Sequence, residues 1–393
     1  MENKPLLTFT LAMLSGLWFA FLALGSPTIN NSNQICFWSI LVISIVLLAR
    51  DLGGPNKVRY EKNWALWGVI VGLAALTLQL VSAFVNNYSL ENEVAGLGTL
   101  LLGFIAVSRF ESELVLRSFY LASASYIVLG WGSEFLVNRI GLFDSGFSFN
   151  LLGHRFTGLA VHPNTMGLLC ALVFAISLWK YRNFGVMAIS LASLVFSENR
   201  GGLLAVFLIL ALWTYSLRGS GLRLFGVVSL SVIALLVTIL FGALREGASD
   251  LTSGRLDIWA VCQEKISQGR VFGLGPNTIA RMYGVDTVDW FRPFHCHNQV
   301  LDDAVNYGII AALINLFALG LILVACLKRS NYLLVSVFLI FAAAEIFESP
   351  IRLFSSSGFI WINLVFFTFY SVALRTNKDS KSIPNRSKDL AIL

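Results

Sequence analysis

The sequence PNTMGLLCALVFAISL, at residues 163–178, is the clearest indication of the fold class of this chain. It contains no charged side chain and begins with a proline. A helix needs about 20 mostly apolar residues to cross the hydrocarbon core of a bilayer. Proline suits the first turn of a helix, where its missing N–H would have had no partner. We therefore predict that a membrane-spanning helix begins at Pro163.

Similar apolar stretches recur along the whole chain, which is 56% hydrophobic and 13% charged, with a mean hydropathy of +0.75. This composition excludes an ordinary soluble globular domain. The predicted spans cover residues 6–24, 35–49, 64–84, 94–108, 117–131, 163–178, 184–197, 201–216, 224–242, 307–327, 332–346 and 357–373. We therefore predict an all-α polytopic membrane protein with about twelve transmembrane helices.

Lysine and arginine set the orientation of these spans, because they favour the cytoplasmic side of a membrane. With both termini in the cytoplasm, most of these cations fall in inner segments, and the short outer loops 25–34 and 85–93 hold none. We expect one transmembrane domain over residues 1–375 and a basic, disordered cytoplasmic tail over 376–393. One long outer loop, at about 243–306, is inserted in that domain. It contains a predicted amphipathic helix near 255–268, which the Gly273–Pro276 turn ends.

The net charge of +6 needs no nucleic-acid partner, because a cytoplasmic rim facing anionic lipid head groups accounts for it. The cysteines show no metal-type spacing. A disulfide between Cys262 and Cys296 would suit an oxidising compartment, but nothing in the sequence supports it. We therefore expect two free thiols.

Two motifs place an arginine beside the start of a predicted span. Arg155 and His162 both precede Pro163, where the predicted helix begins. A helix start flanked by these two side chains is a candidate anion site. The alternative is an interfacial cap with a snorkelling arginine. Arg200 lies in Ser197–Gly202, between two spans with almost no loop. An arginine at that depth needs a partner or an anionic ligand. Glu198 is the alternative partner, but the glycine pair that follows would leave helix N–H groups pointing outward, which favours a phosphate.

Two further motifs lie in the long outer loop. Arg255 is the second residue of the sequence Gly-Arg-Leu-Asp-Ile-Trp, where it could bind a ligand or only cap and solvate the helix. His295 and His297 lie two residues apart, so in an extended segment they share a face. Imidazole exchanges its proton near neutral pH, which favours a general base over a metal ligand or a structural pair.

The order of these motifs resembles the O-antigen ligase and Wzy-type polysaccharide polymerase superfamily, and especially its exopolysaccharide polymerase branch. The resemblance rests on Arg-Phe-Thr-Gly…His-Pro-Asn, Ser-Glu-Asn-Arg-Gly-Gly, Gly-Arg-Leu-Asp-Ile-Trp, Gly-Leu-Gly-Pro and His-Cys-His-Asn-Gln-Val-Leu. It covers residues 150–315 in detail. Asn199 departs from it where a second serine is usual, and Asn306 where a glutamate is common.

The resemblance implies an inverting, metal-independent membrane glycosyltransferase of the GT-C type that needs no cofactor. His297 would be the catalytic base that deprotonates the acceptor hydroxyl, and Arg200 and Arg255 would hold the diphosphate of a polyprenyl-linked donor. Substrate-binding roles are also expected for Arg155, His162, His295 and Asn298.

We therefore expect an enzyme of the bacterial inner membrane, with its active site facing the periplasm, that polymerises polyprenyl-diphosphate-linked repeat units of an O-antigen or exopolysaccharide. The alternatives are a ligase that moves finished glycan to lipid A-core or another acceptor, and a lipid or solute transporter. Polar residues gathered at one face argue against transport, because transporters place charged groups at the bilayer midplane. Expected partners are the lipid-linked donor, a glycan or lipid-linked acceptor, membrane lipids, a chain-length regulator and a flippase.

Overall fold

The computed structural model describes residues 81–82, 84–86, 112–137, 155–158, 163–216, 255–268, 271–275, 278–282, 295–328 and 331–347. Every regular element within these ranges is a helix, so the described part of the chain confirms the all-α prediction. In chain order the elements are α5 (Ser112–Val137), α6 (Pro163–Ile176), the π-helix η1 (Ser177–Tyr181), α7 (Phe184–Phe196), α8 (Arg200–Ser216), α11 (Arg255–Ser267), α12 (Thr278–Met282), α13 (Gln299–Tyr307), α14 (Ile309–Lys328) and α15 (Tyr332–Phe347).

Most of the predicted spans that fall on described residues coincide closely with a helix. The helix predicted at 163–178 begins at Pro163, as expected, and runs through η1. The spans predicted at 117–131, 184–197, 201–216, 307–327 and 332–346 correspond to α5, α7, α8, α14 and α15. Those at 6–24, 35–49, 94–108, 224–242 and 357–373, and nearly all of 64–84, lie outside the described residues. The count of twelve therefore stays a prediction.

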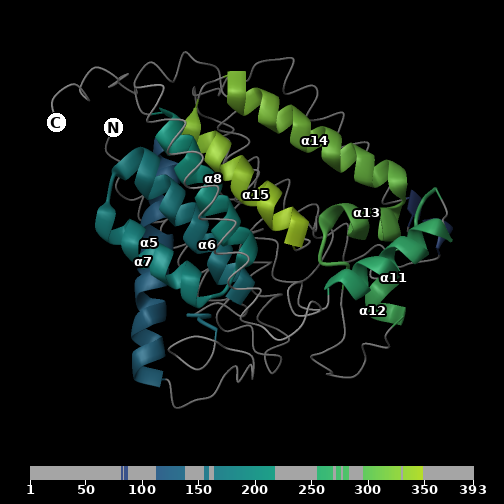
Figure 1. Cartoon of the computed structure of the whole chain (residues 1–393), viewed down its shortest axis with the longest axis horizontal. Coiled ribbons are helices and arrows are strands. Elements are labelled where there is room, and N and C mark those ends of the chain that lie inside the picture. The colour runs from purple at the N-terminus through teal and green to yellow at the C-terminus, as the bar shows by residue number, and fades with distance from the viewer. Residues whose placement is uncertain are drawn as a thin grey trace, which may run out of the picture.

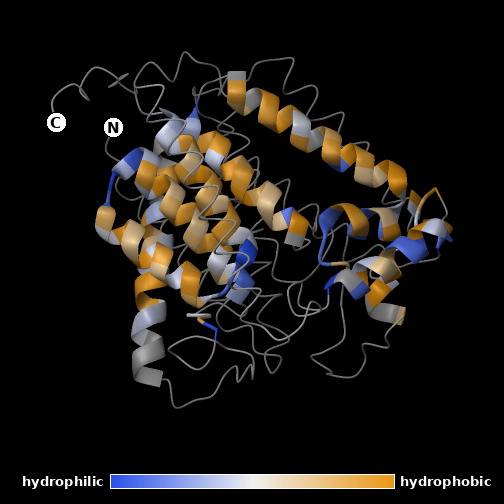
Figure 2. Ribbon diagram, viewed as in Figure 1, coloured by the Kyte–Doolittle hydropathy of each residue, from blue (hydrophilic) through white to orange (hydrophobic). Residues whose placement is uncertain are grey.

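Among the described helices, one is both long and apolar enough to cross a membrane. It runs over Pro163–Tyr181 and has a mean hydropathy of 1.3. The shorter apolar helices are Phe119–Gly132, Phe184–Phe196, Arg200–Ser216, Ile309–Val324 and Tyr332–Ile346. Figure 2 shows that hydrophobic residues dominate the central parts of α6, α7, α8, α14 and α15. Such composition on several neighbouring helices agrees with a membrane protein.

Helix α6 is the centre of the main apolar core. It packs against α5, α7, α8 and α15, which surround it in Figure 1. All its residues from Met166 to Ile176 are buried. A helix that is apolar on every side is stable only when other helices or lipid cover every side. The even hydrophobicity of this stretch therefore explains its central place.

Helices α6 and α15 run in opposite directions. At the end of η1, Trp179 stacks on Tyr332, with the two ring centroids 5.0 Å apart, and its Nε1 donates to Ser336 Oγ at 2.8 Å. Both partners lie in the first turns of α15. The last turn of α15 must therefore lie toward the opposite end of α6, where Pro163 begins that helix. This end of the bundle receives the polar turns described below.

A second, smaller unit is formed by α11, α12 and α13, and it lies beside the main bundle in Figure 1. Its apolar centre contains Cys262, Ile279, Cys296 and Val305. The turn after α11 is fixed to the end of α13, because the amides of Leu274 and Gly275 donate to carbonyl oxygens of that helix at 2.8 and 2.9 Å. Residues Gly273–Gly275 thus contact the end of α13. The prediction of a helix over 255–268 is confirmed by α11.

Candidate active site

The turn between α7 and α8 is built around Asn199. Its Oδ1 accepts the amide of Gly202 at 2.6 Å, which caps the first turn of α8. Its Nδ2 donates to the carbonyl oxygen of Asn164 at 2.7 Å and so ties the turn to the start of α6. A side chain on Gly167 would overlap Asn199, so that glycine allows the close approach. Serine and asparagine are both good N-cap residues, which explains why asparagine serves at this position.

Arg155 reaches this turn from the segment before α6. Its Nε donates to the carbonyl oxygen of Ser197 at 3.0 Å, and its Nη2 donates to Asn164 Oδ1 at 2.8 Å. Arg155 Nε also lies 3.9 Å from Glu198 Oε2. The guanidinium therefore joins the start of α6 to the α7–α8 turn. These contacts describe a positioning role, whereas the sequence predicted that Arg155 binds a ligand.

Two details of the Ser197–Gly202 turn differ from the sequence prediction. Glu198 forms an ion pair with Arg155, a partner that sequence spacing did not suggest. The amide of Gly202 is used by the Asn199 cap, so it does not point outward for a ligand as expected. Both glycines are buried, and a side chain on Gly202 would meet Leu194 Cδ1 at 2.7 Å. The glycine pair therefore permits close packing, and Arg200 stands at the first position of α8.

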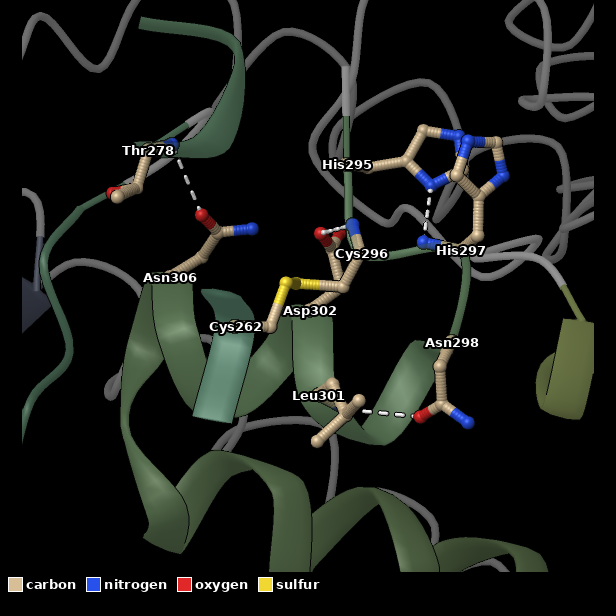
Figure 3. The surroundings of a disulfide bond; sticks show 9 residues. All are labelled: Cys262, Thr278, His295, Cys296, His297, Asn298, Leu301, Asp302 and Asn306. Atoms are coloured by element: carbon tan, nitrogen blue, oxygen red, sulfur yellow. Dashed lines mark hydrogen bonds between the residues drawn. A yellow bond between two sulfur atoms is a disulfide. The ribbon is translucent and has the colours of Figure 1, made fainter. Parts of the chain in front are cut away.

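The His295–Asn298 segment leads directly into α13, a helix that the sequence analysis did not predict. Asn298 Oδ1 accepts the amide of Leu301 at 3.0 Å and caps this helix, as Figure 3 shows. Asn298 Nδ2 donates to the carbonyl oxygen of Ile346 at 3.3 Å, in the last turn of α15. An asparagine cap followed by acidic residues is a recognisable helix-start signal, and it could have revealed α13. Asn298 is thus a structural cap, whatever else it contacts.

His295 and His297 lie side by side, although the left-handed backbone at His297 means that the segment is not the extended one in which their spacing would place them on one face. Their ring centroids are 4.1 Å apart, and the backbone amide of His297 donates to His295 Nδ1 at 3.0 Å. An Nδ1 that accepts a hydrogen bond carries no proton, so His295 holds its own proton on Nε2. His297 has a backbone φ of 50°, a conformation that side-chain-bearing residues rarely adopt. Strained backbone of this kind is enriched at functional sites, because the surrounding structure must impose it.

Cys262 and Cys296 form a disulfide, so the expectation of two free thiols is wrong. The bond joins α11 to the residue between the two histidines, and the two Cα atoms are 6.2 Å apart. The amide of Cys296 also donates to Asp302 Oδ1 at 3.1 Å, which fixes the segment to α13. The cysteines are 34 residues apart, and no sequence pattern showed that the fold would bring them together.

A buried carboxyl group that the sequence analysis missed lies close to this segment. Glu345, on α15, is 4% exposed and directly precedes Ile346, the residue that Asn298 contacts. Asp303 of α13 lies close enough to Glu345 for the two carboxyl groups to interact electrostatically. Asp303 in turn accepts hydrogen bonds from Gln299 and Asn315, both at 2.9 Å. Ionisable residues inside apolar helices are costly and often functional, which is the signal that could have identified Glu345.

The predicted site residues fall into two groups. Arg155 and Arg200 lie at the end of the bundle where α6 and α8 begin, and Asn298 contacts the last turn of α15, which runs toward that same end. Arg255 begins α11, which the disulfide joins to the His295–His297 segment. His162 lies outside the described residues. Within the part of the chain that the structure describes, no three His, Cys, Asp or Glu side chains are grouped to hold a metal ion.

Part of the chain matches a known protein family. Residues 185–316, from α7 into α14, match the family model described as O-antigen ligase. This match confirms the predicted resemblance to the O-antigen ligase and Wzy superfamily over that range. It supports an activity of the general O-antigen ligase or polymerase type, acting on lipid-linked glycans at a membrane. No curated protein matches the chain.

Proposed function

We propose that this chain, whose residues 185–316 match the O-antigen ligase family, is a glycosyltransferase of the bacterial inner membrane. In our proposal it polymerises polyprenyl-diphosphate-linked repeat units of a surface polysaccharide at the periplasmic face. The observation that carries the proposal is the His295–Asn298 segment. The His297 side chain, the proposed base, stands on strained backbone. The neighbouring residues Cys296 and Asn298 hold the segment through a disulfide and a helix cap.

In the proposed reaction, His297 takes the proton from an acceptor sugar hydroxyl. The hydroxyl oxygen then bonds to the anomeric carbon of the donor, while the bond from that carbon to the diphosphate breaks. The configuration inverts because attack and departure occur on opposite faces. A positioned imidazole is well suited to such a proton transfer. His295, whose Nδ1 accepts the amide of His297, orients the turn that carries the base.

The diphosphate leaves with negative charge that must be stabilised. We assign this role to Arg200 and Arg255, because a guanidinium can hold two phosphate oxygens at once. Arg200 stands in the first turn of α8, where helix dipoles also favour an anion. Arg155 supports this end of the bundle by holding the α7–α8 turn. No metal or other cofactor enters the proposed reaction.

A ligase that transfers finished glycan to lipid A-core or another acceptor is the second candidate, favoured by the description of the matched family. Both candidates use the same donor chemistry and differ in the acceptor. The glycan of a deletion strain separates them. Single repeat units on the usual acceptor indicate a lost polymerase, and full-length polymer left on the lipid carrier indicates a lost ligase. Unchanged glycan would contradict both candidates.

Complementation of the deletion strain gives the matched control. The wild-type gene and a gene carrying Arg182→Lys, an exposed position beyond η1, should both restore the glycan pattern. His297→Ala at equal membrane level should not. A chain-length regulator and a flippase are the expected accessory partners, and a polymerase would show altered chain lengths when the regulator is removed.

A further inference from the structure

Trp259, on α11, has an indole N–H that the structure leaves without a hydrogen bond. Its Nε1 atom is buried and has no partner within the described part of the chain. Buried polar groups are almost always hydrogen-bonded, since an unmet donor loses its interaction with water and gains nothing. An exception in a functional region therefore needs a reason, and a bound ligand is one such reason.

Two other tryptophans among the described residues have an indole N–H that donates a hydrogen bond within the protein. Trp131 Nε1 donates to Ser193 Oγ at 2.7 Å, and Trp179 Nε1 donates to Ser336 Oγ at 2.8 Å. In both cases a serine hydroxyl on a neighbouring helix meets the indole. At these positions the fold provides an acceptor for a half-buried tryptophan. Trp259 is likewise half-buried, yet it has no such acceptor among the described residues.

The position of Trp259 identifies the kind of ligand. It lies four residues after Arg255, so the two side chains are neighbours on one face of α11. The Nε atom of Arg255 is buried as well. Ile258 and Cys262 of the same helix turn toward the small apolar core, and the disulfide fixes α11 to the His295–His297 segment. Arg255 and Trp259 are therefore presented by a helix that cannot shift freely relative to His297.

Indole is a donor only, so its partner must be an acceptor. The guanidinium beside it selects for negative charge. The oxygen of a phosphate meets both requirements, and a buried donor meets little competing water. We propose that the Trp259 indole N–H binds an oxygen of the donor diphosphate together with the Arg255 guanidinium. This inference rests on the proposed function, because it assigns a further residue to the same diphosphate site.

The test uses the purified full chain in detergent micelles, with geranylgeranyl diphosphate as the probe, titrated by calorimetry. Trp259→Phe keeps the ring and removes the donor, so it should weaken the Kd for this probe about 10-fold, the size typical of a hydrogen bond to a charged group. Its melting temperature should stay at the wild-type value, because no internal hydrogen bond is lost. Geranylgeranyl monophosphate should show a smaller difference between the two proteins.

Trp179→Phe is the matched control, since it makes the same chemical change where the donor has a partner. It should lower the melting temperature through the lost bond to Ser336 and leave the probe Kd unchanged. An unchanged Kd in Trp259→Phe, with probe binding lost in Arg255→Ala, would overturn the role of Trp259 alone. A wild-type chain that fails to bind the probe would overturn the inference together with the proposed donor class. A lower melting temperature in Trp259→Phe with an unchanged Kd would show that the indole serves the fold.

Discussion

The two histidines of this site differ in the contacts that they make within the protein. His295 uses its Nδ1 to hold the amide of His297, whereas His297 occupies a left-handed backbone conformation. We expect His297→Ala to abolish transfer, because it removes the proposed base. His295→Ala should retain reduced activity, since it removes only an orienting contact. The measurement is polymer formed per unit of membrane-inserted protein. Equal and complete loss in both variants, with rescue by added zinc, would instead point to a metal site.

Arg155 makes a different kind of prediction, because its contacts are internal. Lysine keeps the charge but cannot reproduce the paired donations to Ser197 and Asn164. We expect Arg155→Lys to destabilise the protein by about 1–2 kcal/mol, the scale of one or two lost hydrogen bonds. Thermal unfolding in detergent measures this change. The control is Arg182→Lys, which alters an exposed arginine. If Arg155→Lys has the wild-type melting temperature but binds the donor more weakly, Arg155 contacts the ligand directly.

At the scale of elements, the junction of α13 and α14 depends on Gly308. Its φ is +94°, and a side chain there would overlap the carbonyl oxygen of Val271. Gly308→Ala should therefore destabilise the protein by at least about 2 kcal/mol through backbone strain and displacement of the α11 turn. Gly320→Ala is the control, because that position lies within α14 and an added Cβ there would meet no atom of another part of the protein within 4 Å. It should leave stability equal or higher. Comparable melting temperatures for the two variants would contradict this account of the junction.

The Cys262–Cys296 disulfide is the second prediction at this scale. It closes a segment of 34 residues, for which chain entropy suggests about 3–4 kcal/mol of stabilisation. Reducing the bond, or changing both cysteines to serine, should increase proteolysis of the α11–α13 unit and lower activity. The buried free cysteine Cys326, changed to alanine, is the control for small losses of packing. Proteolysis unaffected by reduction would mean that the apolar contacts alone hold the unit together.

For the whole molecule, the prediction concerns sidedness. Trp179 and Lys180 lie at one end of α6, and the polar turns lie at the other. Glu264 lies on α11, and its side chain is 61% exposed. In a chain in which Cys36, Cys170 and Cys326 are replaced, Glu264→Cys should react with an impermeant thiol reagent in intact spheroplasts. Lys180→Cys should react only after lysis. The reverse pattern would place the proposed site in the cytoplasm.

The features that depend on local composition could be predicted from the amino-acid sequence alone. Apolar stretches of sufficient length predicted the helices α6, α7, α8, α14 and α15, because other helices or lipid must cover such residues. A proline located the start of α6, and the order of short motifs identified the superfamily that the match over residues 185–316 confirms. The roles of the individual site residues stay predictions.

The contacts between residues that are distant in the sequence depend on the folded structure. The Cys262–Cys296 bond, the pairing of Arg155 with Glu198 and the contact of Asn298 with Ile346 join residues 34 or more positions apart. Hydrophobic pattern cannot predict such contacts, because it records which residues are buried and carries no information on their partners. The unmet N–H of Trp259 belongs to the same class, since an unsatisfied donor is visible only when its neighbours are known.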